Sequence, residues 1–380
     1  MSSQAIFEAT IDHYLAPIRP YLSDAAISEV MVNNAEEIYI EKDGQLIKTS
    51  ARFPDEETYR SAVNNVLQFT GRSLYDEQAL VDSRLPDGSR VHVAKPPCAR
   101  RGIVMTIRKF SKMMLDVDWL VELGTLTEQA RDYLRLAVVA ERNLLVAGGT
   151  SAGKTSLLNA LSTFIPPGQR IVLIEDSAEL QLQQPHVLSM ESKPADRYGR
   201  GAVGIRELFR SSLRLRPDRI VIGEVRGGEA LDMIQAMTSG HGGSMGTLHA
   251  DSPADTLNRL ETMALMSKVE LPLYAIRAQI ASAIDVLVQM SRHIGGRRMV
   301  TQIAEVEPLG DDGRYRLRDM FRMTLAADAD EADPTTAGSG EKTMQLKWTG
   351  ARSAFADQLD PQQREMVTPA IAKAFEIDES

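Results

Sequence analysis

The chain has 380 residues, of which 43% are hydrophobic and 25% are charged, and its net charge is −9. This composition is typical of a globular protein, and the length suits two or three domains. The acidic balance gives no general attraction to nucleic acid or anionic lipid, and the single cysteine, Cys98, excludes an internal disulfide or a cysteine-based zinc site. Because no stretch approaches the ~18 apolar residues of a membrane span, we expect a cytoplasmic protein whose membrane association is indirect, through partners.

The N-terminal part of the chain predicts a small α/β domain. A helical lead over residues 1–23 precedes this domain, which we expect to span 24–110. Turn residues between alternating apolar and polar runs predict hairpins over 37–47 and 84–93. A helix is expected over 55–71, closed by a glycine.

The rest of the chain predicts a larger domain and a tail. A linker over 111–124 leads to a domain over 125–325, in which short apolar runs alternate with helical stretches. This alternation is the signature of a mostly parallel, doubly wound sheet. The stretch 326–342 is acidic and rich in small residues, so we expect it to be disordered, and the tail over 343–380 has no assigned role.

The most specific motif is a phosphate loop of the form G-x-x-x-x-G-K-T at residues 148–155. An apolar run precedes it and a helical pattern follows it, so the loop is expected to place phosphates at a helix N-terminus. Lys154 supplies a charge for the β- and γ-phosphates, and Thr155 supplies a hydroxyl for Mg²⁺. A chance match in a glycine-rich turn is disfavoured by this context. The expected nucleotide-binding residues are Gly148, Gly149, Thr150, Ser151, Ala152, Gly153, Lys154, Thr155 and Ser156.

Two carboxylates stand at the ends of buried apolar runs. Glu224 follows the run 220–222 and can hold Mg²⁺ or orient the attacking water. Glu175 follows the run 171–174 and is the candidate general base, although an acidic turn or helix cap explains it equally well. Because the carboxyl ends of parallel strands open onto one crevice, we expect both residues beside the phosphate loop.

A glycine-rich stretch over 238–251 contains two histidines. His241 and His249 are eight positions apart, which does not fit a helical metal pair, and no HExxH motif supports zinc. We therefore predict that they sense the γ-phosphate, with simple packing as the open alternative.

Two sets of arginines are candidates for phosphate contact. Arg84 and Arg90 flank one tight turn, and the planar, always charged arginine fork suits phosphate. Arg206, Arg210 and Arg214 recur every four residues and line one helical face. That face either pairs with acids or reaches a nucleotide in a neighbouring subunit.

Four motifs in order make the chain similar to the type II/type IV secretion ATPase family, and within it to the motor ATPases of tight-adherence (Flp-type) pili. The phosphate loop matches the family's Walker A motif. An Asp box, a Walker B motif and a His box follow at 174–180, 215–230 and 239–250. The resemblance covers roughly residues 24–310. Ser151-Ala152 replaces a common Gly-Ser, and the absent tetracysteine site argues against the type II branch.

The resemblance implies a RecA-like ATPase domain preceded by a PAS-like domain, in a homo-hexamer with ATP bound between the two domains. It implies that Glu175 and Glu224 share catalytic duties with Lys154, and that His249 senses phosphate. It also implies that arginines of the first domain approach the γ-phosphate. We assign this last role to Arg84, Arg90 and Arg108.

These observations predict a Mg²⁺-dependent ATPase motor that drives pilus assembly or protein secretion through an inner-membrane platform protein. The alternative within the family is a conjugation-type secretion ATPase. A nucleic-acid motor on a RecA core is the alternative from another class, but the acidic balance and the lack of an aromatic-rich basic face disfavour it, and no nucleic-acid partner is expected. A nucleotide-gated scaffold without turnover would not need both acidic motifs.

Overall fold

The computed structural model divides the protein into two compact units, residues 1–113 with 195–200 and residues 114–194 with 201–380. The acidic stretch predicted over 326–342 and most of the first ten residues lie outside the part of the chain that the structure describes. The described residues are 10–11, 13–42, 44–75, 77–110, 116–195, 199–293, 296–325 and 344–376.

The N-terminal unit is built on a six-stranded antiparallel sheet with the order β3-β2-β1-β6-β5-β4. Both predicted hairpins and the predicted helix are present. The strands are β1 (Ile27–Val32), β2 (Ile38–Lys42), β3 (Gln45–Lys48), β4 (Leu80–Arg84), β5 (Arg90–Ala94) and β6 (Val104–Arg108), and the helices include α2 (Arg19–Ser23) and α3 (Glu56–Phe69).

Helix α3 covers one face of this sheet. Asp55 caps the N-terminus of α3, because its side chain accepts a hydrogen bond of 2.7 Å from Thr58 N and so satisfies a free N–H of the first turn. Alternate strand residues such as Val91 and Ile107 are buried with Tyr59 of the helix. The neighbours of these residues along each strand face the other side of the sheet, because side chains alternate along a strand.

The C-terminal unit contains a nine-stranded sheet with the order β15-β14-β13-β12-β7-β11-β10-β8-β9. The strands from β12 to β9 are parallel, as expected from the sequence, and β13 to β15 add an antiparallel extension. The strands are β7 (Leu144–Gly148), β8 (Ile171–Glu175), β9 (Val187–Glu191), β10 (Arg219–Ile222), β11 (Met245–Leu248), β12 (Val286–Arg292), β13 (Arg298–Glu307), β14 (Arg316–Leu325) and β15 (Met344–Trp348).

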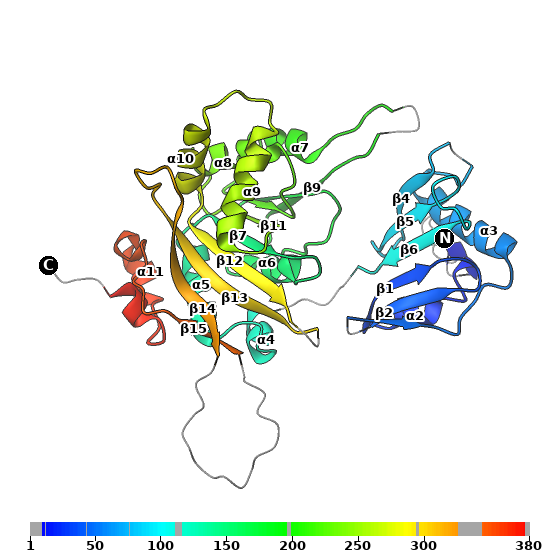
Figure 1. Ribbon diagram of the computed structural model, residues 1–380, viewed down its shortest axis with the longest axis horizontal. Coiled ribbons are helices and arrows are strands. Elements are labelled where there is room, and N and C mark those ends of the chain that lie inside the picture. The colour runs from blue at the N-terminus through cyan, green and yellow to red at the C-terminus, as the bar shows by residue number, and fades with distance from the viewer. Residues whose placement is uncertain are drawn as a thin grey trace, which may run out of the picture. The chain divides into compact units, whose positions relative to one another are not determined.

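Helices cover both faces of this sheet (Figure 1). Strand β7 shows why, since Leu144 and Val146 belong to one buried cluster while Leu145 and Ala147 belong to the other. A central parallel strand is therefore apolar on both faces. The first cluster includes α4 (Val117–Glu122), α5 (Glu128–Val139) and α6 (Lys154–Ser162), and the second includes α7 (Ile205–Ser212), α8 (Glu229–Met237), α9 (Pro253–Leu265) and α10 (Leu273–Ala283).

Residues that the sequence placed outside the ATPase domain also join this unit. Helix α4 lies in the predicted linker, yet Val117 and Leu120 are buried in the core. Strand β15 of the predicted tail pairs with β14, and the tail continues through short helical segments that include α11 (Pro361–Glu365), drawn in red in Figure 1. Within the described ranges, none of the helices has the length and apolar character needed to cross a bilayer.

A buried carboxylate ties the tail to the core. Glu305 of β13 is only 2% exposed, and its carboxylate accepts hydrogen bonds from Tyr133 Oη, Ser353 Oγ and Ala354 N at 2.6–2.7 Å. The ring of Tyr133 also packs against those of Phe355 and Phe375. Since a buried charge needs such donors, the tail completes the α5 side of the fold.

Candidate functional site

The phosphate loop connects β7 directly to helix α6. A Cβ at Gly148 would lie 2.6 Å from the Met290 carbonyl oxygen on neighbouring β12, so the strands pack too closely there for a side chain. Gly153 caps α6 with φ of +94°, and Ser151 adopts φ of +57°. Glycine reaches such angles most readily. The conformation of the loop therefore depends on glycine at position 148, where the strands pack closely, and at position 153, where φ is positive.

Lys154 closes the loop on itself. Its Nζ donates hydrogen bonds to Gly148 O at 3.1 Å and to Gly149 O at 2.9 Å, and the residue is 8% exposed. Lys154, Thr155 and Ser156 form the first turn of α6, where backbone N–H groups lack intrahelical acceptors. The loop thus combines a cation and a helix N-terminus, both of which favour a bound phosphate.

Four neighbouring parallel strands bring the predicted catalytic residues to one edge of the sheet. The strand order there is β7-β11-β10-β8. Lys154 follows β7 and His249 follows β11, while Glu224 follows β10 and Glu175 ends β8. The sequence-based expectation that these residues share the carboxyl edge agrees with this topology.

Three of these side chains form a continuous chain of contacts. Nε2 of His249 lies 3.0 Å from Oε1 of Glu224 and 3.5 Å from Nζ of Lys154. Because a carboxylate only accepts, Nε2 carries the hydrogen and donates it to Glu224, and Lys154 acts as a neighbouring charge. Burial lowers the pKa of His249, and the positive charge of Lys154 lowers it further against the opposing effect of Glu224. His249 is therefore neutral at pH 7.

Glu224 has a second cationic partner that the sequence did not single out. Nη2 of Arg226 donates to Oε2 of Glu224 at 2.6 Å, and Nη1 of the same residue lies 3.5 Å from Asp176. Arg226 thereby joins the acidic ends of β10 and β8. The sequence offered one indication of this contact. Arg226 is only two residues after Glu224, and side chains this close after the end of a strand can contact one another.

Glu175 lies at the same edge but is anchored by its own loop. It is 3% exposed, and its Oε1 accepts hydrogen bonds from Glu179 N and Leu180 N at 2.8 and 2.9 Å. A Cβ at Gly223 would approach its Cγ to 3.0 Å, so the side chain lies beside the residue that precedes Glu224. Both interpretations of Glu175, general base and local cap, agree with this position.

His241 lies at the opposite edge of the sheet. It precedes β11, and its backbone N donates to Ala236 O near the end of α8. The expectation that it senses the γ-phosphate is wrong, because the length of β11 separates it from His249. Arg206 and Arg210 both donate to Asp232, at 2.6 and 2.9 Å. These contacts agree with the interpretation in which this arginine face pairs with acidic residues.

Arg84, Arg90 and Arg108 lie in the N-terminal unit. They occupy neighbouring register positions, Arg84 opposite Arg90 and Arg90 opposite Arg108, so they form one row across β4, β5 and β6. Arg108 Nε lies 3.7 Å from a carboxylate oxygen of Glu29, the next position in the row. Arg90 is next to Val91 in β5, so these two side chains point to opposite faces of the sheet, and Val91 is buried. Because register partners share a face, the whole arginine row lies on the face opposite Val91.

The donors at the loop edge suit Mg²⁺. Among the described residues, no group of three or more His, Cys, Asp or Glu side chains could hold a metal ion by itself. Thr155 and Glu224 offer oxygen donors on neighbouring segments of the site. Mg²⁺ is usually bound in this way, by one or two protein oxygens together with substrate phosphates and water.

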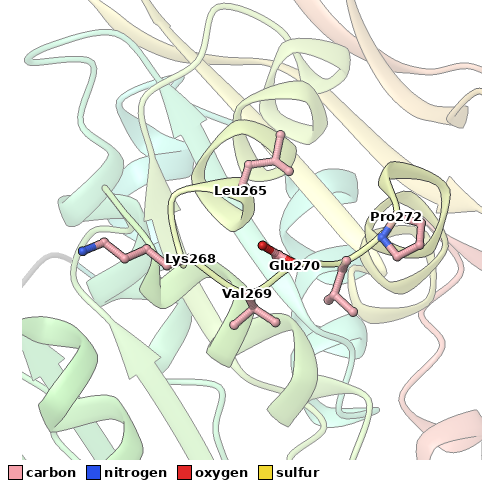
Figure 2. A pocket seen from close by; sticks show the side chains of 6 residues that line it. Leu265, Lys268, Val269, Glu270 and Pro272 are labelled. Atoms are coloured by element: carbon pink, nitrogen blue, oxygen red, sulfur yellow. The ribbon is translucent and has the colours of Figure 1, made fainter.

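A separate surface hollow of about 660 Å³ lies where α9 is connected to α10 (Figure 2). Its lining residues are Leu265, Lys268, Val269, Glu270, Leu271 and Pro272. It contains none of the predicted site residues.

Comparison with known proteins identifies the family of this chain. The family model described as "Type II/IV secretion system protein" matches residues 12–321. A conjugal transfer protein of Mycobacterium tuberculosis is 34% identical over 76% of this chain and 83% of its own length. The type IV secretion system protein PtlH of Bordetella pertussis is 36% identical over 78% of this chain and 95% of its own.

A solved structure confirms the fold. The pilus retraction motor PilT, solved with bound ADP, aligns with a TM-score of 0.57 and 20% identity over 81% of this chain and 82% of its own. The names of the sequence relatives support the conjugation-type alternative, and they do not show the Flp-type pilus assignment. With a family model that covers most of its length, the chain belongs to the type II/IV secretion system protein family.

Proposed function

We propose that this chain is a Mg²⁺-dependent ATPase motor of a conjugation-type secretion system. The observation that carries the proposal is the line of contacts from Lys154 through His249 to Glu224 at the mouth of the phosphate loop. A loop that only bound nucleotide would need neither the histidine nor the carboxylate.

Lys154 is the first residue that must change partners. When a nucleotide enters, its Nζ exchanges the carbonyl oxygens of Gly148 and Gly149 for oxygens of the β- and γ-phosphates. The N–H groups of the loop and of the first turn of α6 hold the same phosphates. Thr155 and Glu224 are the residues that would hold Mg²⁺, which neutralises the charge that develops on the phosphates.

Glu175 and His249 complete the proposed chemistry. Glu175 orients or deprotonates the attacking water, and the hydrogen bonds that its Oε1 accepts from the 179–180 backbone fix the orientation of its carboxylate. The Nε2–H group of neutral His249 donates to Glu224 in the resting state. A γ-phosphate oxygen can replace Glu224 as its acceptor, which would report the presence of ATP.

The mechanical part of the proposal extends beyond one chain. Arg84, Arg90 and Arg108 present a row of positive charge that suits the γ-phosphate of a nucleotide. We propose that the chain works as a homo-hexamer on an inner-membrane platform protein, and that closure around ATP supplies the motion. The conjugation-type names of the relatives favour secretion over pilus assembly.

Purified variants test the catalytic assignment. Lys154→Ala is expected to abolish ATP turnover. Glu175→Gln is expected to retain bound ATP without hydrolysing it. The double variant Arg84→Ala/Arg90→Ala should impair hydrolysis more than ATP affinity. Turnover is measured by phosphate release and affinity by calorimetry. Normal hydrolysis by Glu175→Gln would make Glu224 the base. A several-fold stimulation of the wild type by single-stranded DNA, but not by platform protein, would favour the nucleic-acid motor.

A further inference from the structure

The β12–β13 hairpin passes beside the phosphate loop in the same unit. Met290 of β12 pairs with Gly148, the last residue of β7, so Arg292 lies about 7 Å beyond the end of that strand. Arg298 begins the returning strand β13 and is the register partner of Arg292. The hairpin therefore carries two arginines past the edge of the sheet where the loop lies.

Both arginines face the side of the sheet that carries α6. Met290 and Val300 belong to the same buried cluster as Leu157 and Leu158 of α6. Arg292 and Arg298 are each two positions from one of these strand residues, so they share its face. A Cβ built on Gly153 would lie 3.7 Å from Arg298 Cβ and 3.2 Å from Arg298 Cδ. The exposed Arg298 side chain thus runs along the helix cap of the phosphate loop.

The strand order indicates which end of a nucleotide would meet this arginine. β7 lies between β12 on one side and β11, followed by β10, on the other. Glu224 and His249 follow β10 and β11, so the γ-phosphate belongs on that side of the loop. The α-phosphate and the ribose then extend toward β12 and β13. Arginine suits this position, because its charged fork can donate to phosphate and ribose oxygens.

We infer that Arg298 is a nucleotide-binding residue that contacts the α-phosphate side of ATP bound to its own chain. The inference rests on the proposed function, and it adds a contact on the side of the loop opposite the catalytic carboxylates. Because ADP and ATP share this part of the molecule, the contact serves both nucleotides equally. It holds the nucleotide through hydrolysis, whereas contacts to the γ-phosphate are lost at that step.

The chain offers a matched control in the adjacent arginine. Arg297 lies elsewhere, since a Cβ at Gly124 would be 3.3 Å from its Nη2, which places its guanidinium at the loop between α4 and α5. Arg297→Ala and Arg298→Ala remove the same charge one residue apart. A difference between the two variants therefore reports the position of the guanidinium rather than the net charge of the hairpin.

Calorimetric titration of the full-length chain with ADP and with a non-hydrolysable ATP analogue tests the inference. Arg298→Ala is expected to raise the dissociation constants of both nucleotides by about tenfold, the loss of one charge-assisted hydrogen bond. Arg298→Lys should recover part of the affinity and Arg297→Ala should bind as the wild type does. Thermal unfolding of each variant confirms that the fold is retained.

Three outcomes would overturn the inference. Unchanged affinity in Arg298→Ala beside a wild type that binds ADP normally would reject it and leave the proposed function intact. Loss of affinity for the ATP analogue alone would move the contact to the γ-phosphate, and an equal loss in Arg297→Ala would reduce it to a general charge effect. A wild type that binds neither nucleotide would reject the proposed function itself.

Discussion

The two edges of the C-terminal sheet use polar residues in different ways. At the carboxyl edge, charged side chains contact one another, as Lys154, His249, Glu224 and Arg226 do. At the opposite edge, polar side chains also bind the backbone of neighbouring segments. Asn143, for example, donates to Ala283 O at 2.7 Å and accepts from Ser244 N at 3.0 Å.

Exposure separates the two edges further. The Glu224 side chain is 19% exposed and that of His249 is 37% exposed, so a ligand can reach them. Arg219, at the opposite edge, is completely buried and donates through Nη2 to Val138 O. The comparison teaches that accessibility distinguishes the two edges. Glu224 and His249 are partly exposed and can exchange partners with a ligand, whereas the buried Arg219 has fixed partners in Val138 O and Gln169 Oε1.

The largest effect is expected on stability at the opposite edge. A Cβ at Gly243, where φ is +70°, would overlap Nη1 of buried Arg219. Gly243→Ala should therefore lower the free energy of unfolding by at least about 4 kcal/mol, since it combines backbone strain with displacement of a buried charge. Denaturant unfolding measures this. In Gly240→Ala, where φ is +100° and a Cβ would meet nothing within 4 Å, only strain of about 1–2 kcal/mol is expected. Equal losses would contradict the role given to Arg219.

A second comparison replaces each of the two histidines, His249 and His241, in turn. His249→Ala should lower kcat for ATP hydrolysis by about 100-fold with little change in stability, because it removes a donor aimed at developing charge. His241→Ala, at the opposite edge, should leave kcat within about twofold of the wild type by the same reasoning. Steady-state ATPase assays measure kcat for both variants, and thermal unfolding checks that each variant is folded. A similar kcat in both variants would remove the functional distinction between the edges.

The smallest effect is the pH dependence of stability. Burial and Lys154 lower the pKa of His249 in the folded chain below its ordinary value near 6.5. Below pH 6.5 the unfolded chain takes up the proton more readily than the folded chain, so this contribution is complete above pH 6.5 and is lost as the pH falls through the folded pKa. Urea unfolding between pH 5 and 8 should show a shallower acid decline in His249→Gln. If the wild type and His249→Gln show the same decline, groups other than His249 govern the acid loss of stability.

Much of the fold could be predicted because its signals are local. The apolar runs of β7, β8 and β10 and the glycine positions of the loop follow from backbone geometry and burial on both faces. The tail was harder to predict, because the role of Phe355 and Phe375 depends on Tyr133, which is more than 200 positions away along the sequence. Such distant pairs leave no local pattern.

The sequence by itself determined the phosphate loop and the candidates Glu175, Glu224 and His249, because residues that end parallel strands share one edge wherever those strands lie in the sheet. Only the tertiary structure decided that His249, and not His241, lies at this edge, and that Arg226 and Arg298 lie beside the site. These decisions depend on which strand ends are neighbours in space and on which way each side chain points. Both are set by strand order and register, which the chain acquires only when the whole sheet has formed.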